Sequence, residues 1–111
     1  GNLLGTRADG SDPGVLRGGS AMLINGAATV TNNYMAYVNQ SGVRLNGLAL
    51  GNSDGSTFEN NEIHSVAYTH TAGDAITVDS QGNTVRGNYI HDLQLAAGML
   101  PYNGKGIELY S

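Results

Sequence analysis

The sequence predicts an all-β fold, a parallel β-helix in which short strands stack coil upon coil. A repeat of about 28 residues runs through the chain, and apolar residues alternate with other residues inside each repeat. The chain also contains 17 glycines and 12 asparagines, residues that are typical of the turns between such strands. Because one repeat cannot bury its apolar row alone, the repeats must stack so that the rows join into a continuous core.

The composition excludes several other classes of protein. Charged residues make up 13% of the chain, too few for a coiled coil, and no unbroken apolar run of about 20 residues predicts a membrane span. The net charge of −4 argues against a nucleic-acid partner, which requires a basic face. The absence of cysteine excludes a disulfide scaffold. No stretch keeps a 3.6-residue apolar period, so we expect little or no helix.

The first repeated element reads Thr, apolar, variable, Asn or Gly, Asn, variable, Met or Ile. It occurs at 29–35, 57–63 and 84–90. Its asparagines are Asn33, Asn61 and Asn88, and residues 1–4 fit the end of a further copy upstream of them. Asparagine tolerates the left-handed backbone conformation, and its amide can bond to the turn. We therefore expect the three asparagines to stack as a ladder, each bonded to its neighbours above and below.

The second repeated element reads small, apolar, variable, apolar, polar. It occurs at 21–25, 42–46, 75–79 and 106–110. Alternation with period 2 over so few residues predicts a short strand with one buried face. Together the two elements predict about four coils of 27–31 residues, whose interior holds Val30, Met35, Val43, Leu45, Phe58, Ile63, Ile76, Val78, Val85, Ile90, Ile107 and Leu109.

Three stretches of the chain resemble a known superfamily. The Asn-Thr-Val-Arg-Gly-Asn-Tyr-Ile-His-Asp stretch at 83–92 and Gly-Lys-Gly-Ile-Glu-Leu at 104–109 resemble right-handed parallel β-helix proteins of the pectin-lyase-like superfamily. Residues 1–10 are similar to a Gly-Asn-x-Ile-Gly-Thr repeat of large bacterial surface β-helix proteins. The resemblance implies a right-handed solenoid at an extracellular or cell-surface location in bacteria or phage. It does not choose among lyases, hydrolases, epimerases, tailspikes and adhesive stalks, because one fold hosts many functions.

The connections from the first element to the second lengthen along the chain. The corresponding loops are 36–41, 65–74 and 92–105, and a second variable segment is 47–56. Insertions in a solenoid gather on one face, which is often the binding face. The alternative interpretation is that these loops are surface insertions of little energetic cost.

Alternation also places His64 and His91 on the outer surface, one coil apart and stacked. Two imidazoles at this spacing could bind a metal ion or share a proton, and His70 in the middle loop could join them. The competing interpretation is an exposed surface column that the repeat has copied. No third ligand has a diagnostic spacing, so the sequence leaves the metal unknown.

A second outward column contains Arg44, Thr77 and Glu108, and next to it stand Asn46, Asp79 and Tyr110. The resemblance implies that substrate lies across this face and that lyases use a Lys or Arg base there with carboxylates, sometimes holding calcium. The residue types that such chemistry needs are present at Arg44, Asp74, Asp79, Lys105 and Glu108. No adjacent Asp-Asp pair and no Gly-His-Gly occurs, which weakens the case for a hydrolase. The alternative is a stacked face of solvated charges.

Tyrosines supply most of the aromatic surface of this chain. Tyr34 and Tyr89 are expected to point outward in one column with Glu62, and Tyr68 and Tyr102 lie in the loops. Exposed tyrosines suit stacking on sugars, so Tyr89 and Tyr102 are candidate glycan contacts. Packing between neighbouring strands is the alternative.

The expected function follows from the repeat. We expect residues 1–111 to form a single β-helix segment, an excerpt of a longer helix whose bare strand edges pair with further coils or with other copies end to end. A structural or adhesive module of a secreted or surface protein, binding a polysaccharide or cell-surface glycan through loops on one face, is the favoured function. The alternative is part of a polysaccharide-active enzyme: a lyase, a glycoside hydrolase or an epimerase. No cofactor is certain, and calcium is the one that the carboxylates suggest.

Overall fold

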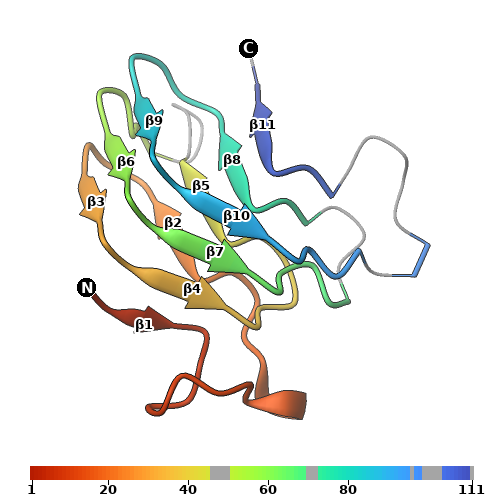
Figure 1. The fold of residues 1–111 in the computed structure, drawn as a ribbon. Helices are drawn as coiled ribbons and strands as arrows, with labels where there is room; N and C mark the ends of the chain where they lie inside the picture. The colour runs from red at the N-terminus through yellow and green to blue at the C-terminus, as the bar shows by residue number, and fades with distance from the viewer. Residues whose placement is uncertain (46–50, 70–72, 96, 99–103, 111) are drawn as a thin grey trace.

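The chain forms a parallel β-helix in which each turn adds one strand to each of three sheets (Figure 1). The computed structural model describes residues 1–45, 51–69, 73–95, 97–98 and 104–110. Within this part, the helical structure is confined to a short 3-10 turn, η1 (Gly14–Leu16), so the expectation of little or no helix is confirmed.

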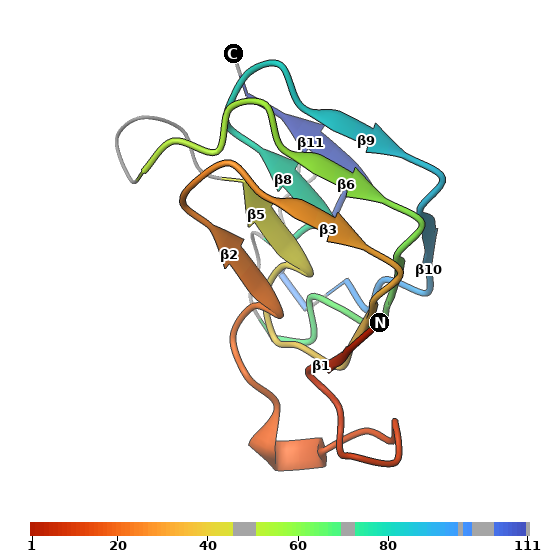
Figure 2. The ribbon, with the colours of Figure 1, turned by 90° about the vertical axis from the view of Figure 1, so that its left-hand side faces the viewer.

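Every paired strand in the described part runs parallel to its neighbour. Sheet A contains β1 (Leu3–Leu4), β4 (Tyr34–Ala36), β7 (Glu62–His64) and β10 (Tyr89–His91). Sheet B contains β2 (Met22–Ile24), β5 (Val43–Leu45), β8 (Ile76–Val78) and β11 (Ile107–Leu109). Sheet C contains β3 (Thr29–Thr31), β6 (Thr57–Glu59) and β9 (Thr84–Arg86), and Figure 2 shows its strands beside those of sheet B.

The strands pair in the register that the repeat predicts. In sheet C Val30 is opposite Phe58, and in sheet A Met35 is opposite Ile63. The helix has about three turns, slightly fewer than the four expected. The reason is that residues 1–4 contribute a strand to sheet A alone and residues 106–110 contribute a strand to sheet B alone, so sheet C has three strands.

The core lies in the middle coils. Met35, Val43, Leu45, Phe58, Ile63 and Ile76 are completely buried, and Val30 and Val78 are nearly so. The prediction was wrong for the last coil, where Ile107 is 46% exposed and Leu109 is 73% exposed, and Val85 and Ile90 are only partly buried. These four side chains belong to the last strand of each sheet, so a neighbouring coil packs against them from one side only.

The predicted asparagine ladder is present on the corner before sheet A. The Asn61 Oδ1 atom accepts hydrogen bonds from the Asn33 backbone N–H at 2.9 Å and from its Nδ2 at 3.1 Å. Asn88 accepts the same pair of bonds from Asn61, and Asn33 accepts them from Asn2. The left-handed conformation falls instead on the residue before each ladder asparagine, with φ values of 58°, 57° and 63° at Asn32, Asn60 and Gly87. At each of these corners one residue makes the left-handed turn, and the asparagine that follows it forms the ladder hydrogen bonds.

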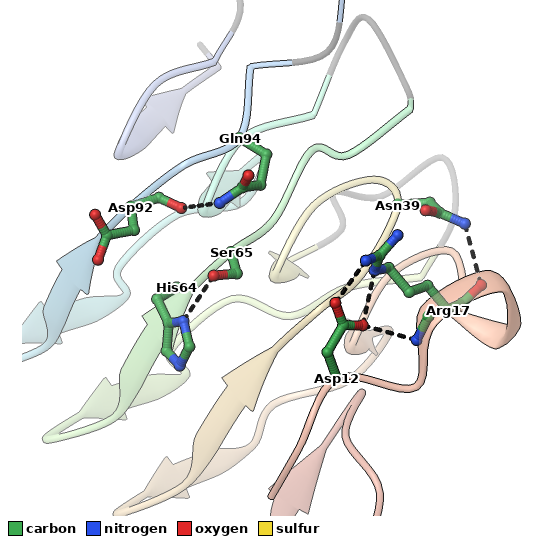
Figure 3. Close-up of polar contacts among 8 residues, drawn as sticks. Asp12, Arg17, Asn39, His64, Ser65, Asp92 and Gln94 are labelled. Atoms are coloured by element: carbon green, nitrogen blue, oxygen red, sulfur yellow. Dashed lines mark hydrogen bonds and ion pairs between the residues drawn. The ribbon is translucent and has the colours of Figure 1, made fainter.

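The segment between β1 and β2 is held against the stack by Arg17. The Nε and Nη2 atoms of Arg17 donate to the Asp12 carboxylate at 2.9 and 2.5 Å, and its carbonyl oxygen accepts from Asn39 Nδ2 at 3.1 Å (Figure 3). The guanidinium carbon lies 3.7 Å from the centroid of the Tyr68 ring. Tyr68 therefore takes part in a cation–π contact that joins segments of the chain far apart in sequence.

Candidate functional site

Two outer faces of the helix carry the candidate residues. The sheet A face comprises Tyr34, Glu62, His64, Tyr89 and His91, and the sheet B face comprises Arg44, Thr77, Asp79, Lys105, Glu108 and Tyr110. Inward residues such as Ile63 in β7 fix this arrangement, because the residues on both sides of an inward side chain must point outward in a strand. Three residues named from the sequence, Asn46, His70 and Tyr102, lie outside the described residues.

His64 and His91 are stacked as the repeat predicts, with ring centroids 4.7 Å apart and planes inclined by 17°. His64 is not an exposed surface residue, however, since only 8% of it is accessible. The rings of Tyr34 and Tyr37 meet it edge-on, with centroids 5.1 and 5.3 Å away. The strand order alone does not reveal this cover, because Tyr37 follows the end of β4 and turns back with a left-handed φ of 59°.

Both imidazoles have both ring nitrogens in hydrogen-bonding contacts. In His64, Nδ1 lies 2.9 Å from Ser65 Oγ and Nε2 lies 2.6 Å from the Tyr34 hydroxyl. Figure 3 shows the His64–Ser65 contact at the end of β7. In His91, Nδ1 lies 2.7 Å from Asp92 Oδ2 and Nε2 lies 3.0 Å from Glu62 Oε1. The two coils therefore present the same pattern: a polar residue holds Nδ1 from the next position in the chain, while Nε2 faces an outward side chain of the coil before it.

The bends that follow β7 and β10 create the Nδ1 contacts. Ser65 and Asp92 both have a φ of 50°, in the left-handed region that non-glycine residues rarely adopt. This conformation turns the chain directly after the histidine and brings the next side chain back beside the imidazole. Glycine is the residue that usually marks a left-handed bend in a sequence, and neither position is a glycine. The sequence therefore did not reveal these partners.

The two histidines differ in their electrostatic surroundings. Burial lowers the pKa of His64, and the neighbouring His91 lowers it further. Hydrogen bonds to Asp92 and then to Glu62 raise the pKa of His91. These surroundings favour the neutral form of His64 and the protonated form of His91.

Tyr89 is the most exposed aromatic residue of this face, with 63% of its surface accessible. Its ring lies on that of His91, with centroids 4.3 Å apart and planes inclined by 26°. Next to this face a groove of about 390 Å³ is lined by Gly1, Asn2, Leu3, Asn32, Asn33, Tyr34, Asn60 and Glu62. Tyr89 is thus an exposed aromatic residue that does not line the groove, whereas Tyr34 lines the groove and contacts His64.

The sheet B face brings together the charged residues that the sequence singled out. Arg44, Thr77 and Glu108 stand in register on β5, β8 and β11. Lys105 forms an ion pair with Glu108, and Arg44 Nη2 lies 3.9 Å from Asp79 Oδ2. Arg44 is partly exposed, and its buried Nε has no hydrogen-bond partner within the described part of the chain.

Asp74 has a structural role at the edge of this face. It is 1% exposed, its Oδ1 accepts the Lys105 backbone N–H at 2.8 Å, and its own N–H donates to Ser41 Oγ at 3.2 Å. Ser41, Asp74 and Lys105 occupy equivalent positions before β5, β8 and β11, so the Asp74 side chain joins one coil to the next. Its carboxylate is out of reach of a ligand.

These surroundings set the pKa values on the sheet B face. Burial raises the pKa of Asp74, and the Glu108 carboxylate raises it further. The hydrogen bond from Lys105 lowers the pKa of Glu108, and the same contact raises the pKa of Lys105. A lyase base needs the opposite shift, because a lysine abstracts a proton only when its pKa lies near the working pH. The arrangement suits hydrogen bonding to a polar ligand better than proton abstraction.

Calcium does not fit the described residues of this face. Calcium requires six to eight oxygen ligands, several of them usually carboxylate oxygens. Asp79 faces Arg44, Glu108 is paired with Lys105, and Asp74 is bonded to the backbone. On the sheet A face, by contrast, Glu62, His64 and His91 bring one ligand atom each to within 4.8 Å of one another.

Comparisons with known proteins agree with the architecture. In the described residues we find no helix with the length and apolar character needed to cross a membrane. Searches of curated proteins and of solved structures returned no match. A family model described as the right handed beta helix region matches residues 9–111. This match is consistent with a place in the pectin-lyase-like superfamily. The chain therefore belongs to the right-handed β-helix family.

Proposed function

We propose that this β-helix is a rigid module that binds a polysaccharide or cell-surface glycan on its sheet B face. We place it in an extracellular or cell-surface protein of bacterial or phage-like origin, as the resemblance of its repeats suggests. The observation that carries the proposal is Arg44, a partly exposed arginine on β5, whose inward neighbours Val43 and Leu45 are completely buried.

The surroundings of Arg44 support hydrogen bonding to sugars. The 3.9 Å separation between Arg44 Nη2 and Asp79 Oδ2 is too long for a hydrogen bond, so within the described part of the chain this contact leaves Nη2 available to sugar hydroxyl or carboxylate oxygens. Asp79, whose side chain is 40% exposed, supplies an acceptor on the same face, and Tyr110, which is 51% exposed, supplies an aromatic surface. Because Arg44 and Asp79 are held by β5 and β8, which are paired strands, the protein backbone needs little ordering when a chain of sugars lies across it.

Affinity electrophoresis and calorimetry with neutral and uronic-acid polysaccharides test this proposal. We expect Arg44→Ala to weaken binding at least tenfold. The matched control is Arg86→Ala, which removes another arginine that is paired with a carboxylate, Glu59, but lies on sheet C. Absence of binding to every polysaccharide, or equal affinity of the two variants, would refute the proposal.

The alternative is a polysaccharide-active enzyme, and one observation favours it. Asp74 and Glu108 are neighbouring carboxyl groups whose pKa values shift in opposite directions, which is the pattern of acid–base pairs in hydrolytic sites. The burial of Asp74 opposes this function. Incubation with the same polysaccharides, following unsaturated products by ultraviolet absorbance and new reducing ends by a colorimetric assay, tests it. Turnover that Glu108→Gln abolishes would replace the binding proposal with the enzymatic one.

A further inference from the structure

We propose that Glu62, His64 and His91 form a zinc site on the sheet A face, in which one ion joins two adjacent coils. One ligand atom from each residue lies within 4.8 Å of the other two. This site does not rest on the glycan proposal, because it uses a different sheet and different residues.

The donor set matches zinc in number and kind. Two imidazole nitrogens and one carboxylate oxygen, with water in the fourth position, are a recurrent zinc coordination. In a tetrahedral site with metal–ligand bonds of about 2.0–2.1 Å, neighbouring ligand atoms lie about 3.3 Å apart. The His91 Nε2 and Glu62 Oε1 atoms are already 3.0 Å apart, and the His64 ligand atom lies within 4.8 Å of both. Because the two imidazole rings are stacked nearly parallel, the His64 ring must turn from Tyr34 toward this pair to complete the triad.

The hydrogen bonds around the site occupy Nδ1 of both imidazoles, which assigns coordination to Nε2. A metal-binding histidine commonly has its other ring nitrogen bonded to a carboxylate or to another polar group, which fixes the tautomer and the ring. Asp92 holds Nδ1 of His91 and Ser65 holds Nδ1 of His64, through the left-handed bends described above. Two coils therefore repeat both a ligand and the group that positions it.

The Tyr34 hydroxyl occupies the place of zinc beside His64. It lies 2.6 Å from Nε2, and zinc binding replaces this hydrogen bond. The ion has a path from solvent, because the side chains of His91 and Glu62 are 24% and 40% exposed. Tyr34→Phe removes the competing hydroxyl and is expected to bind zinc at least as tightly as the native chain.

Competition with a chromogenic chelator, using the EDTA-treated protein and Zn²⁺ alone, measures the stoichiometry and affinity. We expect one zinc ion per chain, and Glu62→Gln and His91→Gln each to weaken binding at least tenfold. The matched control is Glu59→Gln on sheet C, which should bind within twofold of the native chain. We expect Asp92→Asn, which alters a positioning residue, to weaken binding by about tenfold.

Nuclear magnetic resonance of the native chain gives a readout that does not depend on the variants. Zinc should shift the Nε2 resonances of His64 and His91, while both Nδ1 atoms keep their protons. Circular dichroism in EDTA verifies that each variant is folded, and zinc should raise the Tm of the native chain and of Glu59→Gln but not that of His91→Gln. Failure of the native chain to bind one equivalent at micromolar zinc, equal binding by the Glu62 and Glu59 variants, or displacement by equimolar calcium would overturn the proposal.

Discussion

Replacing Asn61 with alanine tests whether the asparagine ladder holds the coils together. The Asn61 side chain is buried, and its Oδ1 accepts two hydrogen bonds from Asn33. Its Nδ2 donates to the carbonyl oxygens of Val30 and Glu59 and to Asn88 Oδ1, at 3.0–3.1 Å. Each bond contributes about 1 kcal/mol net, and a buried group left without a partner costs about 1–3 kcal/mol. We therefore expect Asn61→Ala to lower the free energy of unfolding by about 3–5 kcal/mol.

Urea unfolding followed by far-ultraviolet circular dichroism and by tyrosine fluorescence measures this loss. Asn52→Ala is the matched control, because Asn52 is exposed and accepts one local bond, from the Asp54 N–H. It should cost about 1 kcal/mol or less. Asn2→Ala is a second comparison, because Asn2 is an exposed member of the same ladder and its side chain donates one bond, to Asn33. Equal losses for Asn61→Ala and either comparison variant would refute the argument that burial and bond number set the cost.

Three further predictions follow from the same contacts. In a pH titration by nuclear magnetic resonance, the pKa of His91 should lie above that of His64. The stabilisation from protonated His91 should be complete below about pH 6.5 and lost as the pH rises through its raised pKa, whereas that from neutral His64 should be present above about pH 6.5 and lost as the pH falls through its lowered pKa. The reverse order of titration would contradict the assigned hydrogen bonds. Phe58→Ala should cost about 3–5 kcal/mol in urea unfolding, because Phe58 is completely buried, whereas Leu109→Ala should cost under about 1 kcal/mol. Similar losses would show that the last coil is packed in solution. If the exposed Ile107 and Leu109 pair with other copies of the chain, sedimentation should show association that Leu109→Lys abolishes; a monomer at high concentration would exclude such pairing.

The sequence was sufficient for the architecture because the repeat is a local property of the chain. Copies that recur at a nearly constant spacing must pair like with like, so the register, the inward rows and the asparagine ladder could all be read from that spacing. The same spacing correctly predicted that His64 stacks on His91 and that Arg44 and Glu108 stand in one column. The periodicity predicted burial of Ile107 and Leu109 incorrectly. Burial requires a coil on both sides of the strand, and the apolar pattern within one strand contains no information about the coils next to it.

The side-chain contacts that depend on the bends between strands could not be predicted from the sequence. The sequence suggested Asp74 as a ligand-binding carboxylate, and only the position of the Lys105 amide revealed that it joins two coils. Ser65 and Asp92 reach the imidazoles through left-handed backbone conformations, which a sequence indicates mainly where the residue is glycine. For this protein the sequence by itself determined the solenoid and the faces on which the candidate residues lie, because periodicity dictates strand pairing. The tertiary structure alone decided which of those residues are buried, paired or free, because these properties depend on the directions of loops and side chains, which the repeat does not encode.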